Sequence, residues 1–251
     1  MLIYGDLSDD FKLFIEKILN ENKNIRICDF YYLGRKYWLK QLETTVDGGF
    51  LTKFFKINPK KSLKNEINAL GFLNSKNAST PKLIAYGDTF LIISDVGAAV
   101  NEIIEKERND LQKINILKKC SEALANLHEI NLIHGRPAIR DMAWDGKKIS
   151  FLDFEAMKLK QDLQKQKVLD LLIFVYELFR CPDVKDAWID EILENYYDVD
   201  TYNLMRLKIK KYKFLLQLLY PFKNSSKKDL SALIRILKWG SNPQTSPKAR
   251  L

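Results

Sequence analysis

Two aspartates, Asp141 and Asp153, stand 12 residues apart in the segment LHEINLIHGRPAIRDMAWDGKKISFLDFEA, residues 127–156. Asp145 and Gly146 between two short apolar runs predict a tight β-hairpin, with one aspartate on each arm. Carboxylates that converge in this way can bind one Mg²⁺, which takes few protein carboxylates and completes its shell with water and phosphates. Because such a metal neutralises charge on a transferring group, the expected chemistry is phosphoryl transfer.

Three more polar residues accompany this pair. His134 is expected in the loop before Asp141, either as a proton acceptor or as a structural partner of nearby backbone. His128 is expected in the last turn of a helix, where it interacts with the helix dipole. Two histidines with no neighbouring cysteine do not favour zinc. Asp170 stands in an apolar helical run next to Leu171 and Leu172. A buried acid there needs hydrogen-bond partners, which we expect loop amides to supply.

Strands are expected to dominate the first part of the chain. The expected elements, in order, are a helix over 9–22, a hairpin over 25–43, a strand over 50–57, a helix over 62–74 and two short strands over 80–97. The helix over 9–22 is indicated by apolar residues at helical spacing, and the hairpin by β-branched and aromatic runs around Gly34.

Helices are expected to dominate the rest. The pattern predicts helical structure over 98–127 and, after the hairpin of the two aspartates, further helices from residue 162 onward. Strands followed by helices are typical of an α+β fold with two lobes. We therefore expect an N-terminal lobe over 1–96, a helical C-terminal lobe over 97–240 and a disordered tail over 241–251.

The segment LHEINLIHG, residues 127–135, and the residues after it resemble a known pattern. That pattern is His-x-Asp, then Asn five residues later, then Asp-Phe-Gly. This chain has His134-Gly135-Arg136, Asp141 and Asp153-Phe154-Glu155 at matching spacing. The resemblance is to atypical members of the protein-kinase-like superfamily: aminoglycoside kinases, the KEOPS-complex kinase and, most closely, the Kdo and heptose kinases of lipopolysaccharide core (WaaP-like and InaA-like). In the last group a polar residue commonly replaces the final glycine.

The upstream motifs extend the same resemblance. GRKYWLKQLE is similar to the strand whose lysine binds the ATP phosphates, which implies that role for Lys40. LKNEINALGFL resembles the helix whose glutamate pairs with that lysine, which implies Glu66. TPKLIAYGDTFLIISDVG resembles the run into the adenine-contacting hinge, which implies Ser94 to Val96.

The downstream motif KVLDLLIFVYELFR resembles the helix whose aspartate, here Asp170, supports the catalytic loop. Five motifs in this order imply a protein-kinase-like bilobal fold, with a β-rich N-lobe and a helical C-lobe. They also imply an enzyme that uses ATP and Mg²⁺, with Asp141 and Asp153 as metal ligands. The acceptor implied is a hydroxyl of a lipopolysaccharide core sugar or of a protein serine or threonine.

The chain departs from the kinase pattern in two places. Arg136 occupies the position of the catalytic aspartate, and no Gly-x-Gly-x-x-Gly precedes Lys40. Lys53 and Lys56 are alternatives for the ATP lysine. Two interpretations stand: an active enzyme in which Asp141 is both metal ligand and proton acceptor while Arg136 holds a phosphate, and a pseudokinase that keeps the fold and binds a partner.

Positive charge is concentrated in the last fifth of the chain. There are 41 Lys and Arg against 32 Asp and Glu, a formal net charge of +9. Residues 201–251 hold 12 of those basic residues and one acid, so the first 200 residues are close to neutral. Within 206–238 the basic residues alternate with Leu, Phe, Tyr and Trp, which suits an anionic membrane surface or an anionic glycolipid. Nucleic acid is not favoured, because no motif for reading it is present.

The cysteines and the termini indicate the compartment. Cys28, Cys120 and Cys181 are too far apart for a disulfide framework or a zinc ribbon, which favours a reducing compartment. The start MLIYGDLSDD carries acids where a signal peptide carries basic residues. We expect a bacterial cytoplasmic protein, with peripheral contact between its basic region and the inner membrane.

Overall fold

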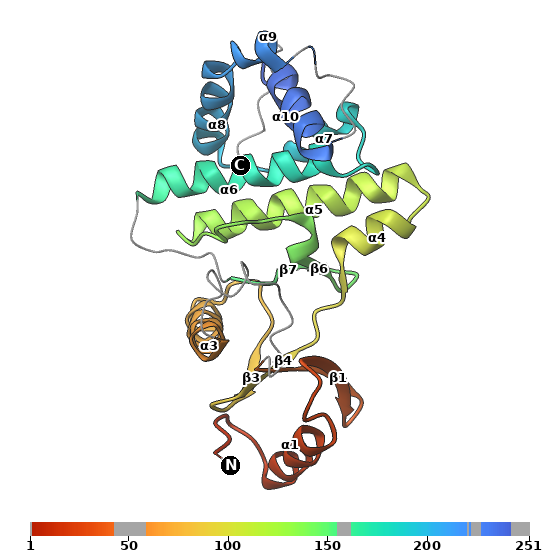
Figure 1. Ribbon diagram of the computed structural model, residues 1–251, viewed down its shortest axis with the longest axis vertical. Helices are drawn as coiled ribbons and strands as arrows, with labels where there is room; N and C mark the ends of the chain where they lie inside the picture. Colours follow the sequence, from red (N-terminus) through yellow and green to blue (C-terminus); the bar gives the residue numbers. More distant parts are fainter. Residues whose placement is uncertain (1, 43–58, 155–161, 220, 222–226, 242–251) are drawn as a thin grey trace, which may run out of the picture. The chain divides into compact units, whose positions relative to one another are not determined.

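The computed structural model describes residues 2–42, 59–154, 162–219, 221 and 227–241. The chain divides into two compact units (Figure 1), one formed by residues 1–96 and 153–155 and the other by residues 97–152 and 156–251. Strands lie in the first unit together with helices, and most of the second unit is helical, so the α+β class is confirmed. The kinase-like identity of the two units is still a prediction.

The described residues of the first unit form one antiparallel sheet of four strands in the order β1-β2-β4-β3, with two helices. The elements are α1 (Asp9–Glu21), β1 (Ile27–Tyr32), β2 (Arg35–Gln41), α3 (Pro59–Ser75), β3 (Leu83–Tyr86) and β4 (Phe90–Ser94). Leu33 and Gly34 join β1 to β2 with φ values of 46° and 73°. Positive φ at both turn residues matches the twist of the flanking strands. The hairpin predicted over 25–43 is confirmed, with its strands at Ile27–Tyr32 and Arg35–Gln41.

Helix α1 covers one face of this sheet. The side chain of Ser8 caps it by accepting a hydrogen bond from the N–H of Phe11 at 3.3 Å. The buried residues that pack together between helix and sheet are Phe11, Ile15, Leu19, Phe30, Tyr37, Leu39, Ala85, Phe90 and Ile92. Because neighbouring strand residues point to opposite faces, Lys40 points away from α1, toward the face where α3 lies.

Helix α3 extends the helix predicted over 62–74 at both ends. It begins at Pro59, whose missing N–H costs nothing at the first helical position. Its buried residues are Leu63, Glu66, Leu70 and Leu73. The strand predicted over 50–57 falls in the segment 43–58, outside the described residues.

The second unit combines a small antiparallel sheet, in the order β5-β6-β7, with helices. Its described elements are β5 (Ala98–Ala99), α4 (Val100–Lys106), α5 (Asp110–Glu129), the 3-10 turn η1 (Ile139–Asp141), β6 (Met142–Trp144), β7 (Ile149–Phe151), α6 (Leu163–Arg180), the 3-10 turn η2 (Asp186–Trp188), α7 (Ile189–Leu193), α8 (Val199–Lys211), α9 (Leu215–Leu219) and α10 (Lys228–Trp239). The hairpin predicted around Asp145 and Gly146 is confirmed as β6 and β7. The tail predicted to be disordered lies outside the described residues from position 242.

The helical structure predicted over 98–127 is confirmed except at its start, and it is interrupted once. The chain first forms the short strand β5, and the helical part is then split into α4 and α5. Between them, the Glu107 carboxylate accepts hydrogen bonds from the N–H groups of Arg108 and Asn109 at 2.7 and 2.8 Å. The Asn109 side chain accepts one from the N–H of Leu111 at 2.9 Å. These local bonds satisfy backbone groups that a continuous helix would use, so α5 starts afresh at Asp110.

Gly97 begins the second unit in a conformation that favours glycine. Its φ is +94°, and a Cβ at this position would lie 2.1 Å from the carbonyl oxygen of Trp144 and 2.7 Å from the Cα of Asp145. The backbone next to Ala98 therefore approaches the β6–β7 hairpin closely, and β5 pairs with β6.

Helices α8 and α10 pack on α6, and α9 joins them at the end of the unit farthest from α6 (Figure 1). The apolar side of α10 is turned inward, where Ala232, Ile234, Ile236, Leu237 and Trp239 are buried. Within the described ranges, no helix has the length and apolar character needed to cross a bilayer.

Candidate functional site

Lys40 and Glu66 form an ion pair inside the first unit. Lys40 stands on β2, opposite Leu91 of β4, and Glu66 stands on α3 with its side chain only 10% exposed. A carboxylate this deeply buried needs a charged partner, and Lys40 supplies it. The structure thus brings together the two residues that the kinase resemblance pairs. The competing lysines Lys53 and Lys56 lie outside the described residues.

The ion pair lines a small cavity of about 50 Å³. Arg26 and Ser62 line it too, so a second cation and a hydroxyl group accompany Lys40. Positive and hydroxyl donors around one cavity suit an anionic group such as a phosphate. Sequence reasoning missed Arg26. The register of the predicted hairpin could have found it, because a turn at Leu33 and Gly34 places Arg26 beside Gln41, the residue after Lys40. In the structure the Arg26 carbonyl accepts the N–H of Gln41 at 2.7 Å.

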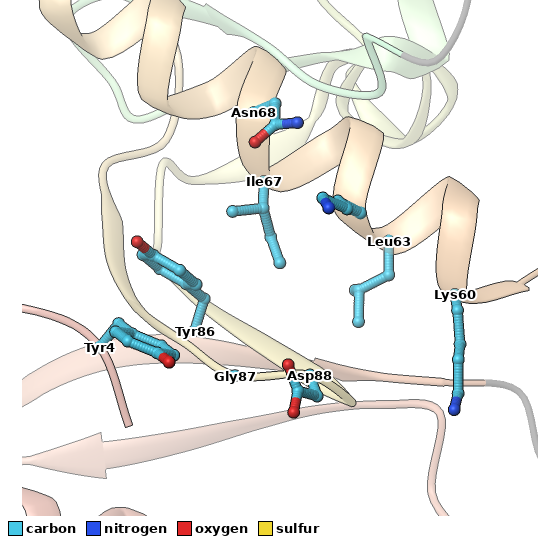
Figure 2. Close-up of a pocket in the computed structure, with 9 residues that line it drawn as sticks. Tyr4, Lys60, Leu63, Ile67, Asn68, Tyr86, Gly87 and Asp88 are labelled. Carbon is cyan, nitrogen blue, oxygen red and sulfur yellow. The ribbon is translucent and has the colours of Figure 1, made fainter. Parts of the chain in front are cut away.

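A larger cavity of about 420 Å³ lies in the first unit between α3 and the turn that follows β3 (Figure 2). Tyr4 and Tyr86 stack on one side of it with ring centroids 5.3 Å apart. Lys60 and Asp88 contribute opposite charges from its other walls. Among the described residues that line it, none is a residue that the sequence predicted for the site, so this cavity is separate from the Lys40–Glu66 pair.

The residues predicted to contact adenine lie at the end of β4. Ser94 is tied to Lys82 in both directions: the N–H of Ser94 donates to the Lys82 carbonyl at 3.0 Å, and its hydroxyl oxygen accepts the N–H of Lys82 at 2.9 Å. Asp95 accepts a hydrogen bond from the indole N–H of Trp38 at 2.7 Å. Val96 is half-buried. The strand end is therefore well fixed, and its contact with adenine stays a prediction.

Asp170 organises the loop that precedes Asp141 in the second unit. Its carboxylate, 1% exposed, accepts hydrogen bonds from the backbone N–H groups of His134 at 2.7 Å and Gly135 at 2.9 Å. The prediction that loop amides satisfy this buried acid is confirmed. Since α6 carries Asp170, the position of the loop is set by the helix beneath it.

His134 is fully buried, and backbone groups contact both of its ring nitrogens. Nε2 lies 2.7 Å from the carbonyl oxygen of Leu152, and Nδ1 accepts the N–H of Arg136 at 3.3 Å. A carbonyl oxygen only accepts, so Nε2 carries the proton and Nδ1 is the acceptor. This geometry favours the structural role of His134 over the role of proton acceptor.

The His128 ring lies between Asp170 and Tyr196. Its Nδ1 lies 2.6 Å from the Tyr196 hydroxyl, and its Nε2 lies 3.4 Å from Oδ2 of Asp170. Burial raises the pKa of Tyr196, so its hydroxyl stays protonated. Because Nε2 faces a carboxylate oxygen, which only accepts, Nε2 carries the ring proton and the Tyr196 hydroxyl donates a hydrogen bond to Nδ1. His128 stands in the last turn of α5, as expected. Its ring is buried and bridges Tyr196 and Asp170, contacts that the expected interaction with the helix dipole did not predict.

Asp141 ends the 3-10 turn η1, with its side chain 11% exposed between two arginines. A guanidinium nitrogen of Arg136 lies 3.6 Å from one carboxylate oxygen, and Nε of Arg140 lies 3.8 Å from the other. The carbonyl of Asp141 accepts the N–H of Leu152 at 2.8 Å, which ties η1 to the end of β7. The carboxylate therefore already has positive neighbours, and a metal ion would share it with them.

Asp153 has a left-handed backbone, with φ of 57°, which is uncommon for a residue other than glycine and marks a constrained position. It groups with the first unit, whereas Asp141 belongs to the second. Both side chains offer carboxylate oxygens, the ligand type that Mg²⁺ prefers. Their convergence on one ion is still a prediction.

No family model matches the chain. A protein of Haemophilus influenzae described as uncharacterized is 34% identical to it over 236 residues, which covers 92% of this chain and 96% of that protein. The similarity thus extends across both units.

Proposed function

This chain belongs to the same protein family as the Haemophilus influenzae protein, and we propose that it is an ATP- and Mg²⁺-dependent phosphotransferase of the lipopolysaccharide-kinase or atypical Ser/Thr-kinase type. The observation that carries the proposal is the ion pair between Lys40 and Glu66. A strand lysine and a helix glutamate that meet in this way are what a nucleotide-phosphate site of the resembled kinases requires. Arg26 and Ser62, in the same cavity, add donors for an anion.

The proposal assigns a role to the residues predicted to bind ATP and Mg²⁺. Lys40 binds the α- and β-phosphates of ATP while Glu66 orients it, and Ser94 to Val96 contact the adenine. Asp141 and Asp153 hold Mg²⁺, which when bound neutralises charge on the phosphoryl group. Because positioning and electrostatics supply most of the rate enhancement of phosphoryl transfer, loss of the usual base costs less than loss of these contacts.

The acceptor we propose is a hydroxyl of a lipopolysaccharide core sugar, with a protein serine or threonine as the sibling possibility. The proposed setting is the cytoplasmic side of the bacterial inner membrane. Mass spectrometry of core oligosaccharide from a strain that lacks the protein tests the first acceptor, since one phosphate per oligosaccharide should disappear.

Thermal unfolding with and without ATP and Mg²⁺ tests the nucleotide site, and ATP turnover tests catalysis. We expect ATP to raise the unfolding temperature only when Mg²⁺ is present. Lys40→Ala and Asp153→Ala should each abolish turnover, whereas Lys76→Ala, an exposed lysine just beyond α3, should not. Unchanged turnover in either of the first two variants contradicts the assignment.

A pseudokinase is the second candidate, and the pair of arginines around Asp141 favours it. Guanidinium groups at 3.6 and 3.8 Å already balance the charge that a metal would otherwise neutralise. In that case ATP binds without turnover, or does not bind, and the protein functions by binding a partner. A nucleotide response without any release of phosphate separates this candidate from the enzyme.

A further inference from the structure

Large apolar side chains are exposed where α8 ends and α9 begins. Leu207, Phe214 and Leu218 are each between 60 and 65% exposed, and none of the described residues of α9 is buried. Tyr212 stands between them with its ring centroid 6.5 Å from that of Phe214. Exposing several large apolar groups in one short stretch is unfavourable in water unless another surface covers them.

Four lysines surround these apolar residues: Lys208, Lys210, Lys211 and Lys213 are all exposed. In the described part of the chain, no acidic side chain forms an ion pair with any of them. The sequence contains no Asp or Glu from 201 to 228. The stretch is therefore a patch of positive charge that its own unit does not neutralise. We name the exposed side chains from Leu207 to Leu218 the α8–α9 surface.

The backbone holds this surface in one shape. Helix α8 does not end in an open loop, because Lys213 donates its N–H to the carbonyl of Lys210 at 3.1 Å and Leu215 donates to Tyr212 at 3.0 Å. Leu216 continues the same pattern to Lys213 at 3.0 Å. Successive bonds of this kind carry the chain from α8 into α9, so the apolar and basic groups are presented together.

Two arginines of the same basic region, Arg206 and Arg235, do not belong to this surface. Arg206 is buried, with its guanidinium 3.8 Å from the centroid of the Trp239 ring. Arg235 pairs with Asp186 and donates to the carbonyl of Phe179 at 2.6 Å. Both arginines hold α8 and α10 inside the unit. The basic residues of the amphipathic segment 206–238 thus fall into two groups. Arg206 and Arg235 make contacts inside the unit, and the lysines of the α8–α9 surface are exposed.

From these observations we infer that the α8–α9 surface docks on the surface of an anionic phospholipid bilayer. Apolar side chains ringed by lysines fit the headgroup region, where rings and aliphatic groups enter the acyl boundary and the lysines meet lipid phosphates. Nucleic acid would attract the lysines but leaves Leu207, Phe214 and Leu218 uncovered. This inference goes beyond the proposed phosphotransferase and does not depend on it.

Flotation of the full chain with lipid vesicles tests the inference. Vesicles of phosphatidylethanolamine and phosphatidylglycerol in equal parts should bind the protein at low salt, and vesicles of phosphatidylcholine alone should not. The triple variant Lys208→Gln, Lys211→Gln and Lys213→Gln should bind about a hundredfold more weakly, from about fivefold per lysine. A triple variant of exposed lysines elsewhere (Lys61→Gln, Lys76→Gln and Lys147→Gln) should bind as well as the wild type.

A second pair of variants separates apolar insertion from charge alone. Phe214→Ser with Leu218→Ser should bind at least about tenfold more weakly, whereas Leu13→Ser with Leu111→Ser, which removes equally exposed leucines, should have no effect. Since all these side chains are exposed, the variants should fold, and a normal unfolding temperature checks this. Absence of binding to the anionic vesicles, or equal losses in the two triple variants, overturns the inference. Binding to duplex DNA that the Phe214 and Leu218 substitutions leave intact overturns it in favour of nucleic acid.

Discussion

The backbone N–H of His134 donates a 2.7 Å hydrogen bond to the carboxylate of Asp170, although 36 residues separate them in the sequence. This bond fixes a loop on the buried side of helix α6, in the same unit. It also explains why an acid is tolerated at 1% exposure, because a carboxylate that accepts backbone N–H groups is well satisfied.

Removing that carboxylate should destabilise the protein strongly. Asp170→Ala leaves the N–H groups of His134 and Gly135 without their acceptor, at a cost of about 2–5 kcal/mol in the free energy of unfolding. Denaturant unfolding measures this. Asp200→Asn, a change to an exposed aspartate in the first turn of α8, is the control and should cost less than about 1 kcal/mol. Equal losses in the two variants would mean that the Asp170 contacts contribute little.

Removing one guanidinium from Asp141 should strengthen the proposed metal site. Arg140→Gln takes a positive charge away from the carboxylate, so we expect half-maximal ATP turnover at about tenfold less Mg²⁺. Arg108→Gln, an exposed arginine elsewhere in the second unit, should leave the requirement unchanged. A titration of turnover against Mg²⁺ decides this, and an unaltered requirement in Arg140→Gln would exclude Asp141 as a metal ligand.

The stabilisation that comes from the contact between α6 and α10 should be lost at acidic pH. Asp229 accepts hydrogen bonds from Nε of Arg180 at 2.7 Å and from the Tyr176 hydroxyl at 3.1 Å, and the bond from Arg180 is the main reason that its pKa lies below the ordinary value. A lowered pKa stabilises the fold above the unfolded pKa of about 3.9, and this stabilisation is lost as the pH falls through the folded value. Asp229→Asn should therefore lower the urea midpoint at neutral pH, and the difference from the wild type should vanish in acid. A difference that is constant with pH would contradict this.

The cysteines should differ in reactivity toward a thiol reagent. Cys120 is completely buried, and burial raises its pKa far above the usual range, so it is neither accessible nor ionised. Cys28 and Cys181 are partly exposed. We expect two thiols to react with a disulfide reagent in the native protein and the third only after denaturant is added. Cys120→Ala should abolish the late phase, and a Cys120 that reacts without denaturant would show that this part of the core opens readily.

Local patterns in the sequence were sufficient for much of the first unit. The β-branched and aromatic runs on either side of Gly34 predicted the β1–β2 hairpin, and placed Lys40 on a strand. The burial of Asp170 and its need for loop amides also followed from a single acid in an apolar helix. In each case the decisive signal is local: the residue types around a turn, or the need of a buried acid for hydrogen-bond donors.

Other features depended on contacts that periodicity does not encode. The break before α5 arises from side chains of Glu107 and Asn109 that bond to backbone within two residues. The internal roles of Arg206 and Arg235 depend on partners more than thirty residues away. For this reason, the sequence did not distinguish Arg206 and Arg235, which bond to groups within the unit, from the exposed lysines between Lys208 and Lys213.

The close approach at Gly97 restricts how this family can vary. Any side chain would enter the space held by the backbone of Trp144, and no rotamer can avoid a clash that begins at Cβ. We therefore expect a library of all substitutions at position 97 to return only glycine among the variants that accumulate in cells, while Gly34, whose Cβ would meet open space, tolerates asparagine. Position 97 should be one of the few at which distant relatives of this chain have no freedom.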